Sequence, residues 1–391
     1  MSDIFKMKGV EELIRRILDA VKEKEKIILL GDADPDGVAS VIILKEALEI
    51  LGNPPSLIYF PNREKEGYGL NKKALFFLKN YAPALLITLD CGIGNFEEIE
   101  LAKNSGFEVI IIDHHEILEQ VPKVSIIVDP KQKSDQYPFK GLCTAAIVYK
   151  IVRPLLFEAQ KTFKPESFLE LAMIATLSDQ MPQDQDNEKI LKEGLLSLQY
   201  TKRVGLKALM ETCGFKDFDA REIREKIIPP LASANSKKHQ SEIYLLLTEE
   251  SNLRAKKIAE TLFKKSKLRR ERINEIFEET KGKIDPSLPV VFLGDEDLPS
   301  TLTGVIASKV FQRCKKPTFI YKKGKRESQG SVRTPKGVDS VKVMSSCSKF
   351  LEVYGGHSQA SGFRVKNENL EKFEECLINY FSQNEKNRYL Y

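Results

Sequence analysis

The feature that most constrains the fold is a set of short apolar runs, four of which are followed by an aspartate, either at once or after a single glycine. Branched aliphatic residues fill the runs and Gly, Pro or Asp bounds them, which is typical of strands buried on both faces. The runs are Ile27–Leu30, Ser56–Phe60, Ala84–Leu89, Glu108–Ile112 and Ser125–Val128. Helical patterns such as Ala39–Leu51 and Asn71–Lys79 lie between most of them. The first 130 residues are therefore expected to form an α/β domain around a parallel sheet with right-handed crossovers.

The rest of the chain predicts a second, smaller α/β domain. A chain of 391 residues is too long for one ordinary core. A charged segment at Ser251–Lys283 carries an apolar stripe and predicts a long connecting helix. Beyond it, a strand at Pro289–Leu293, a helix at Thr303–Arg313 and a strand at Thr318–Tyr321 are expected. We predict a catalytic domain at 1–215, a helical connector at 216–284 and the second domain at 285–385.

Composition restricts the class of protein but not its function. The net charge of +5 identifies no partner, although residues 251–270 hold eight Lys or Arg and one Glu. Such a run is either a solvated surface or a nucleic-acid contact. Apolar runs are too short for a membrane span. The six cysteines are far apart, so we expect reduced thiols, no zinc ribbon and a cytoplasmic protein.

The strand-end aspartates Asp32, Asp90, Asp113 and Asp129 predict a ligand site. The carboxyl ends of parallel strands meet at one edge of a sheet, where ligands bind. A single aspartate there could be a helix cap, but four would repel one another unless a cation neutralised them. The first of these ends, Gly31–Gly37, holds three alternating carboxylates, as a calcium loop does. Ile43 occupies the position where that loop needs Glu, so a phosphate-handling metal site fits better.

Two of the four histidines in the chain are adjacent and follow a strand-end aspartate. His114 and His115 come directly after Asp113. Imidazole beside carboxylates suits Mn²⁺ or a similar ion, and the carboxylates would orient each ring through its second nitrogen. The sequence therefore predicts a metal centre of aspartates and histidines in the first domain.

These motifs resemble those of the DHH phosphoesterases. Asp32–Gly37, Asp90–Gly92 and Asp113–His115 match the first three motifs of that family in order and spacing, and Ala175–Pro182 is similar to the fourth. Gly355–Gly362 resembles the signature of the DHHA1 domain that accompanies the family. The resemblance implies an N-terminal parallel-sheet DHH domain and a smaller C-terminal α/β DHHA1 domain, joined by the long helix. It covers residues 8 to 380, and the five motifs together are specific.

The resemblance also implies roles for individual residues. Two ions, Mn²⁺ or Mg²⁺, would be held by Asp32, Asp34, Asp90, His114 and Asp179. His115 would contact the scissile phosphate, while Asp36 and Asp113 would support the ligands. Substrate contacts would come from Arg63, Tyr68, Arg333, Gly355, Gly356 and His357. Tyr68 could stack on a base or brace its turn.

Within the family, the segments Pro61–Arg63 and Glu66–Leu70 and the long helix resemble those of RecJ-like exonucleases. That resemblance implies 5′-to-3′ hydrolysis of single-stranded DNA, with release of 5′-mononucleotides and a role in DNA repair. In the segment Ala232–Lys237, Lys237 or Lys238 could replace an arginine typical of RecJ. The chain ends just after the DHHA1-like unit, so no counterpart of RecJ's OB-fold is expected. A protein partner could then supply more DNA-binding surface.

Two other functions stay open. A phosphodiesterase for short oligoribonucleotides (a nanoRNase) or cyclic dinucleotides would explain the expected lack of an OB-fold. A non-catalytic RecJ-like replication scaffold is disfavoured, because every metal-ligand position is filled. Two minor expectations concern single residues: His239 is expected at the surface, and the pair Phe76 and Phe77 is expected to pack within its helix.

Overall fold

The computed structural model describes residues 2–63, 65–117, 120–162 and 165–388. It divides into two compact units, Met1–Lys267 and Leu268–Tyr391. The three-part division with boundaries at 215 and 284 stays a prediction. No helix in the described ranges combines the length and apolarity that crossing a membrane requires.

The first unit is built on a five-stranded sheet in the order β2-β1-β3-β4-β5. All neighbouring strands are parallel. The strands are β1 (Ile27–Gly31), β2 (Leu57–Tyr59), β3 (Ala84–Leu89), β4 (Phe107–Ile112) and β5 (Ile126–Val128). Each lies within or beside one of the five apolar runs, so the predicted α/β class and parallel sheet are confirmed.

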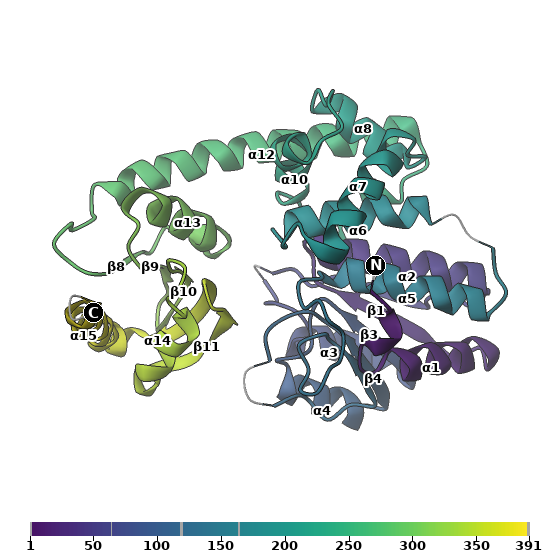
Figure 1. Cartoon of the computed structure of the whole chain (residues 1–391), viewed down its shortest axis with the longest axis horizontal. Coiled ribbons are helices and arrows are strands. Elements are labelled where there is room, and N and C mark those ends of the chain that lie inside the picture. Colours follow the sequence, from purple (N-terminus) through teal and green to yellow (C-terminus); the bar gives the residue numbers. More distant parts are fainter. Residues whose placement is uncertain (1, 64, 118–119, 163–164, 389–391) are drawn as a thin grey trace. The chain divides into compact units, whose positions relative to one another are not determined.

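Helices cover both faces of this sheet, which is why its strands are apolar throughout (Figure 1). In β1, Ile27 and Leu29 belong to one core, and Ile28 and Leu30 to the other. The first core is shared with α1 (Val10–Lys22), α2 (Pro35–Leu51) and α5 (Thr144–Glu158). The second core is shared with α3 (Lys72–Leu78) and α4 (Phe96–Asn104).

The remainder of the first unit is mainly helical. Its helices are α6 (Glu166–Ser178), α7 (Gln185–Gln199), α8 (Val204–Thr212), α9 (Ala220–Glu222), α10 (Ile228–Leu231) and α11 (Glu242–Leu247). A small antiparallel hairpin joins β6 (Ser236–Lys237) to β7 (Gln240–Ser241). Short 3₁₀ turns lie at Ile4–Lys6 and Lys79–Tyr81, and a π-helical turn lies at Ile223–Ile227. The second unit has 3₁₀ turns at Ser300–Leu302, Ser348–Phe350 and Asn367–Asn369.

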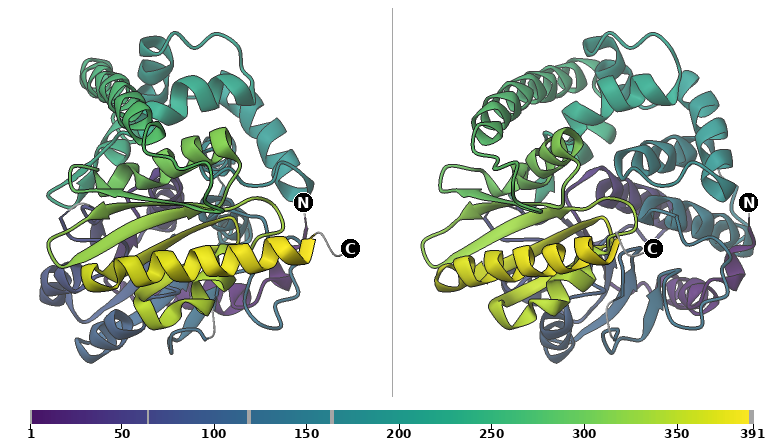
Figure 2. Two further views of the ribbon diagram at one scale, coloured as in Figure 1. Left: turned by 90° about the vertical axis from the view of Figure 1, so that its left-hand side faces the viewer. Right: turned by 60° about the vertical axis from the view of Figure 1, so that its left-hand side comes forward.

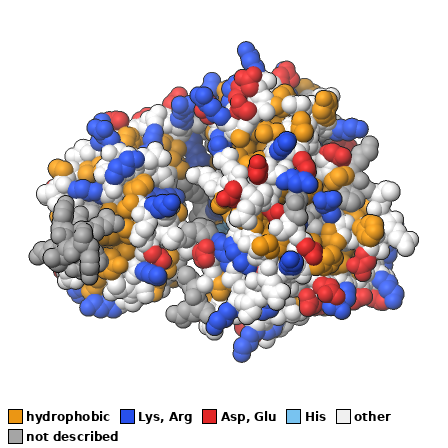
Figure 3. Space-filling model, viewed as in Figure 1, with side chains coloured by type: hydrophobic (Ala, Val, Ile, Leu, Met, Phe, Trp, Pro, Cys, Tyr) orange, Lys and Arg blue, Asp and Glu red, His pale blue; other side chains and the backbone are white. Residues whose placement is uncertain are grey.

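The predicted long helix is α12 (Asn252–Lys281). Its early residues Ala255, Ala259 and Leu262 are buried in the first unit's core. Ile276, near its end, is buried in a core of the second unit. On the face drawn in Figure 3, Lys and Arg side chains alternate with Asp and Glu side chains, as on an ordinary solvated surface.

The second unit holds another five-stranded sheet, in the order β11-β12-β10-β9-β8. Only β8 and β9 pair in parallel. Its elements are β8 (Val291–Asp295), α13 (Thr303–Cys314), β9 (Thr318–Lys323), β10 (Glu327–Arg333), α14 (Ser340–Ser346), β11 (Leu351–His357), β12 (Ala360–Lys366) and α15 (Leu370–Arg388). Figure 2 shows α15 across one face of the sheet, where Phe373 and Leu377 are buried.

The expectation of six reduced thiols is wrong for one pair of cysteines. Cys347 and Cys376 form a disulfide, with Cα atoms 6.1 Å apart. They are 29 residues apart in sequence, a spacing that suggests no pairing. They meet because Cys347 closes α14 and Cys376 lies in α15, and both helices pack in the same core. Cys91, Cys143, Cys213 and Cys314 are free thiols.

Candidate metal centre

The turn after β1 places its carboxylates at the edge of the sheet. Asp34 is the N-cap of α2, and its Oδ1 accepts hydrogen bonds from the backbone N–H groups of Asp36 and Gly37, each at 3.0 Å. A Cβ atom at Gly37 would lie 2.4 Å from the carbonyl oxygen of Asp32, so only glycine fits there. The turn holds Asp32 and Asp34 at the carboxyl end of β1.

Asp36 connects this turn to a distant helix. Its buried carboxylate accepts hydrogen bonds from the backbone N–H groups of Thr144, at 2.8 Å, and Ala145, at 2.7 Å. These N–H groups belong to the first turn of α5, where a negative charge is favourable. Burial and the nearby Asp179 nevertheless raise the pKa of Asp36. Asp36 thus joins α2 and α5 beneath the acidic edge.

Asp90 follows β3 in a left-handed backbone conformation, with φ of 63°. This conformation is uncommon for a residue other than glycine and turns the side chain sharply away from the strand direction. Its Oδ1 accepts a hydrogen bond from the Thr144 hydroxyl, at 3.1 Å. Burial, followed by the charges of Asp36 and Asp34, raises the pKa of Asp90 well above the usual aspartate range. Asp90 is therefore a carboxylate that would gain from a nearby cation.

Asp113 orients the adjacent histidine. Its Oδ1 lies 2.7 Å from His115 Nδ1 and accepts the backbone N–H of His114, at 2.8 Å. Its Oδ2 accepts the backbone N–H of Ile93, at 3.1 Å. Burial acts to raise the pKa of Asp113, but His115 and these donors hold it at about 2. Asp113 is thus an anion that fixes the ring of His115.

His114 is buried among carboxylates from three segments. Its Nε2 lies 3.3 Å from Asp90 Oδ1 and 3.2 Å from Asp179 Oδ2, and Asp179 directly follows α6. Burial disfavours the charged ring, yet Asp179 and the other carboxylates raise the pKa of His114 to about 9. Burial, then Asp179 and Asp36, raises the pKa of Asp34 to about 7. The crowded carboxylates thus favour protonation of their neighbours.

The donor atoms fit a metal centre. Within the described residues, three overlapping groups each bring their ligand atoms within 4.8 Å of one another. The groups are Asp32, Asp34 and Asp90; Asp36, His114 and Asp179; and Asp90, His114 and His115. Carboxylate and imidazole donors suit Mn²⁺, and carboxylates suit Mg²⁺. The five predicted ligands thus lie together, but their roles as ligands stay predictions.

The fourth strand-end aspartate, Asp129, belongs to none of these three groups. It is buried after β5, and its Oδ1 accepts the backbone N–H of Lys131, at 2.8 Å. Burial and the charge of Asp113 raise its pKa to about 7. Asp129, like Asp113, therefore lies outside the three donor groups, although the sequence gives it the same strand-end position as Asp32 and Asp90.

Arg63 and Tyr68 come from the loop between β2 and α3. The Arg63 guanidinium donates to Asp32 through Nε, at 2.9 Å, and to Asp34 Oδ2, at 2.9 Å. The Tyr68 hydroxyl donates to the carbonyl oxygen of Asp90, at 2.8 Å, and lies 3.4 Å from His115 Nε2. Both predicted substrate residues are thus beside the acidic groups, where Tyr68 braces the turn after β3. Their contacts with substrate stay predictions.

The other predicted substrate residues lie in the second unit. Arg333, at the end of β10, and His357, at the end of β11, both pair in register with Ala360 of β12. The guanidinium of Arg333 donates to the Ser308 hydroxyl, at 3.0 Å. Gly355 and Gly356 precede His357, and a Cβ atom at Gly356 would lie 2.7 Å from Ser361 Cα. The His357 side chain lies outside the described part of the chain, so its role is untested.

The sequence analysis missed Thr144, which contributes a hydroxyl to Asp90 and a backbone N–H to Asp36. No motif marks it. Its place at the start of α5 is the signal that could have found it, since free N–H groups at a helix start attract carboxylates.

Comparisons with known proteins agree with this geometry. Residues 26–176 match the model of the DHH family, N-terminal domain. The chain is 32% identical over 382 residues to the single-stranded-DNA-specific exonuclease RecJ of Bacillus subtilis, covering 96% of this chain and 48% of that protein. The chain spans about half the length of the first curated relatives it matches.

Solved structures share the fold. A crystal structure of exonuclease RecJ bound to manganese matches with a TM-score of 0.80 at 24% identity, over 98% of this chain and 96% of that one. RecJ from Thermus thermophilus in complex with Mn²⁺ matches with a TM-score of 0.82 at 23% identity, over 96% of this chain and 55% of that one. At these identities the likeness establishes the fold.

Proposed function

The chain carries a DHH-family domain at residues 26–176, and from this premise we propose that it is a metal-dependent exonuclease. It would hydrolyse phosphodiester bonds of single-stranded DNA in the 5′-to-3′ direction and release 5′-mononucleotides. The observation that carries the proposal is the convergence of three donor groups on one edge of the sheet. The relatives named single-stranded-DNA-specific exonuclease RecJ support the substrate.

The position of each residue suggests its role in the reaction. Asp32, Asp34, Asp90, His114 and Asp179 would hold two ions, Mn²⁺ or Mg²⁺. When bound, such ions lower the pKa of a water and neutralise charge on the reacting phosphate. Asp113 holds the ring of His115 through Nδ1, which leaves Nε2 available for the substrate, and in the imidazolium form Nε2 can donate to a phosphate oxygen. Arg63, a planar guanidinium beside the acids, can grip a phosphate in a bidentate manner.

The second unit would contribute substrate contacts from Arg333, Gly355, Gly356 and His357. The proposal also retains the cytoplasm as the compartment and a protein partner as an additional DNA-binding surface. A pull-down with immobilised chain and single-stranded DNA would test the partner separately.

The test is a nuclease assay with a single-stranded DNA of a few tens of nucleotides, labelled at either end, in the presence of Mn²⁺. Release of a labelled mononucleotide from the 5′ end, with the 3′ label released last, would support the proposal. Asp90→Asn should be inactive, whereas Asp217→Asn, which changes an exposed aspartate elsewhere in the first unit, should be active. Activity in Asp90→Asn would point to a contaminating nuclease.

Parallel reactions with an RNA dinucleotide and a cyclic dinucleotide decide between substrate classes. Cleavage of these two substrates alone would replace the exonuclease with a small-substrate phosphodiesterase. No cleavage of any substrate, with Mn²⁺ and Mg²⁺ at several pH values, would contradict enzymatic function and favour a scaffold.

A further inference from the structure

Glu66 holds the loop that carries Arg63 and Tyr68 on the side away from the acidic groups. Glu66 Oε2 accepts a hydrogen bond from the Tyr59 hydroxyl, at 3.0 Å, and one from the backbone N–H of Asn62, at 3.2 Å. The backbone N–H of Glu66 in turn donates to the carbonyl oxygen of Asn62, at 2.8 Å. Glu66 therefore closes a turn in which Arg63 directly follows Asn62.

The β6–β7 hairpin holds the same turn from outside. Asn62 Nδ2 donates to the carbonyl oxygen of Ser236, at 2.6 Å, and the backbone N–H of Phe60 donates to the carbonyl oxygen of His239, at 3.0 Å. Lys238 and His239, at the tip of the hairpin, have φ of 50° and 64°. Two consecutive left-handed residues other than glycine are uncommon, so the surroundings must fix this conformation.

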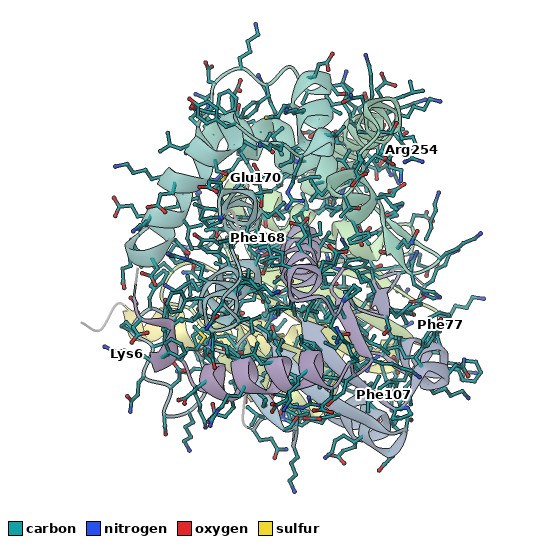
Figure 4. The ribbon with its side chains drawn as sticks, turned by 90° about the vertical axis from the view of Figure 1, so that its right-hand side faces the viewer. Lys6, Phe77, Phe107, Phe168, Glu170 and Arg254 are labelled. Carbon is teal, nitrogen blue, oxygen red and sulfur yellow. A yellow bond between two sulfur atoms is a disulfide. The ribbon has the colours of Figure 1, made fainter. Side chains whose placement is uncertain are left out.

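The two-residue β6–β7 hairpin favours this conformation at its tip, and the packing of the His239 side chain adds a further restraint. Its ring centroid lies 4.3 Å from that of Tyr59, in a stacked arrangement, and 4.4 Å from that of Phe77 on α3. Phe77 is labelled in Figure 4. The His239 Nδ1 lies 3.9 Å from Glu66 Oε1. His239, predicted at the surface, is thus half-buried there, with 29% of its side chain exposed. Phe77 packs as expected, whereas Phe76 is exposed.

We propose that Glu66 and His239 form a positioning pair, which sets where Arg63 and Tyr68 lie beside the acidic edge. Packing alone does not require a carboxylate at Glu66, where an apolar side chain would fill the space. The Glu66 carboxylate accepts hydrogen bonds from Tyr59 of β2 and from Asn62 of its own loop. These two bonds fix both the direction of the loop and its distance from β2. The inference rests on the proposed function, since it assigns the loop a task in holding substrate.

The kinetic test compares disruptive and conservative variants of the full chain. Glu66→Ala and His239→Asn should raise KM for single-stranded DNA by about fivefold or more and leave kcat within about twofold. Asparagine tolerates the left-handed backbone, so the second variant removes the ring without adding strain. Glu66→Gln keeps an acceptor for Tyr59 and Asn62 and should restore KM to within about twofold of the original value.

Hydrogen exchange tests the same idea without activity. Backbone amides of residues 62, 63 and 65–70 should exchange faster in Glu66→Ala and His239→Asn, and at the original rate in Glu66→Gln. Glu97→Gln on α4, which loses an exposed ion pair with Lys72 of α3, is the matched control and should not differ. Because exchange needs no substrate, an inactive protein with this exchange pattern would contradict the proposed function but still support the positioning pair.

Two results would overturn the positioning pair. One is unchanged exchange and unchanged KM in both disruptive variants. The other is a fall in kcat together with loss of the Mn²⁺-induced rise in Tm, because this would show that the two residues support the acidic site itself. A rescue by Glu66→Gln would confirm that the acceptor, not the charge, is what positions the loop.

Discussion

Two buried clusters in the first unit contain aspartate, and they differ in charge balance. Asp186 accepts hydrogen bonds from the backbone N–H of Ser2, at 2.6 Å, from the Tyr137 hydroxyl, and from Lys150 Nζ, at 3.0 Å. Both Asp186 and Lys150 are at most 5% exposed. Although burial opposes it, the bonds from Tyr137, Ser2 and Lys150 lower the pKa of Asp186. This cluster contains its own counter-charge.

The metal centre is the opposite case. Burial and mutual repulsion raise the pKa values of Asp34, Asp36 and Asp90. Among the described residues, Arg63, His114 and His115 are basic side chains that lie against this group. A balanced buried pair serves the fold, whereas a crowd of carboxylates weakens the fold unless a cation is added. The difference between the clusters separates residues kept for stability from residues kept for chemistry.

Asp90→Asn should give the largest effect and break the link between activity and stability. It removes a carboxylate common to two donor groups, so we expect nuclease activity to fall by about a thousandfold or more. The Tm of the metal-free protein should stay unchanged or rise, because a repelled buried charge is removed. Assays with Mn²⁺ and thermal unfolding with a chelator check the two halves. A clear fall in the metal-free Tm would contradict the contrast between the metal centre and the Asp186 cluster.

Asp186→Asn should lower stability and leave metal binding unchanged, the reverse of Asp90→Asn. It leaves the Lys150 ammonium buried without its carboxylate, so we expect a loss of about 3 kcal/mol in unfolding free energy. The affinity for Mn²⁺ should not change, since Asp186 belongs to none of the described donor groups. Urea unfolding and Mn²⁺ titration measure these quantities. Stability equal to that of the original chain would mean that the cluster is not held by its ion pair.

The two clusters should also differ in pH dependence. Asp34, with a folded pKa of about 7, keeps a proton in the folded state that the unfolded chain releases near pH 4. The unfolded state then binds fewer protons, so metal-free stability should fall as pH rises from 4 to 7, by at most about 1.4 kcal/mol per pH unit for this group. Asp34→Asn should flatten the slope, and saturating Mn²⁺ should reverse it, because binding needs deprotonated ligands. A metal-free stability that rises over this range would refute the assignment.

Thr144→Val should have the smallest effect on the metal centre. It tests the role of the Thr144 hydroxyl separately from that of its backbone N–H at the start of α5. The variant loses the bond from the hydroxyl to Asp90 but keeps the backbone N–H that Asp36 accepts. We expect Mn²⁺ affinity to fall by about tenfold, as for other groups that orient a ligand. Thr144→Ser should retain the original affinity. Calorimetric titration of both variants would decide, and equal affinities would leave the Thr144 hydroxyl without a role in orienting Asp90.

The sequence predicts the first unit well because its strands are covered on both faces. Continuous apolar runs such as Ala84–Leu89 have no other stable arrangement in water, and their ends locate Asp90 and Asp113 at one edge. β10 was not predicted, because the run Glu327–Arg333 is polar and contains glycine. Its strand character depends on pairing with β9 and β12, which no local pattern indicates.

The site was predictable where a motif marks it and not where tertiary packing creates it. Asp32, Asp90 and His114 lie in recognisable motifs. Thr144 and His239 reach the site or its loop only through contacts between segments distant in sequence, 54 residues in the case of Thr144 and Asp90. Asp129 shows the converse, since its strand-end position places it with the aspartates that predict a ligand site, yet it belongs to none of the described donor groups.

The left-handed backbone at Asp90 has a practical consequence for capturing a substrate complex. Alanine at this position would add steric cost to the loss of the carboxylate, whereas asparagine adopts this conformation readily. Asp90→Asn should therefore yield a correctly folded but silent protein on which an intact DNA strand could be trapped and visualised. Among the acidic residues of the site, the one with the least common backbone geometry offers the cleanest way to stop the reaction without disturbing the fold.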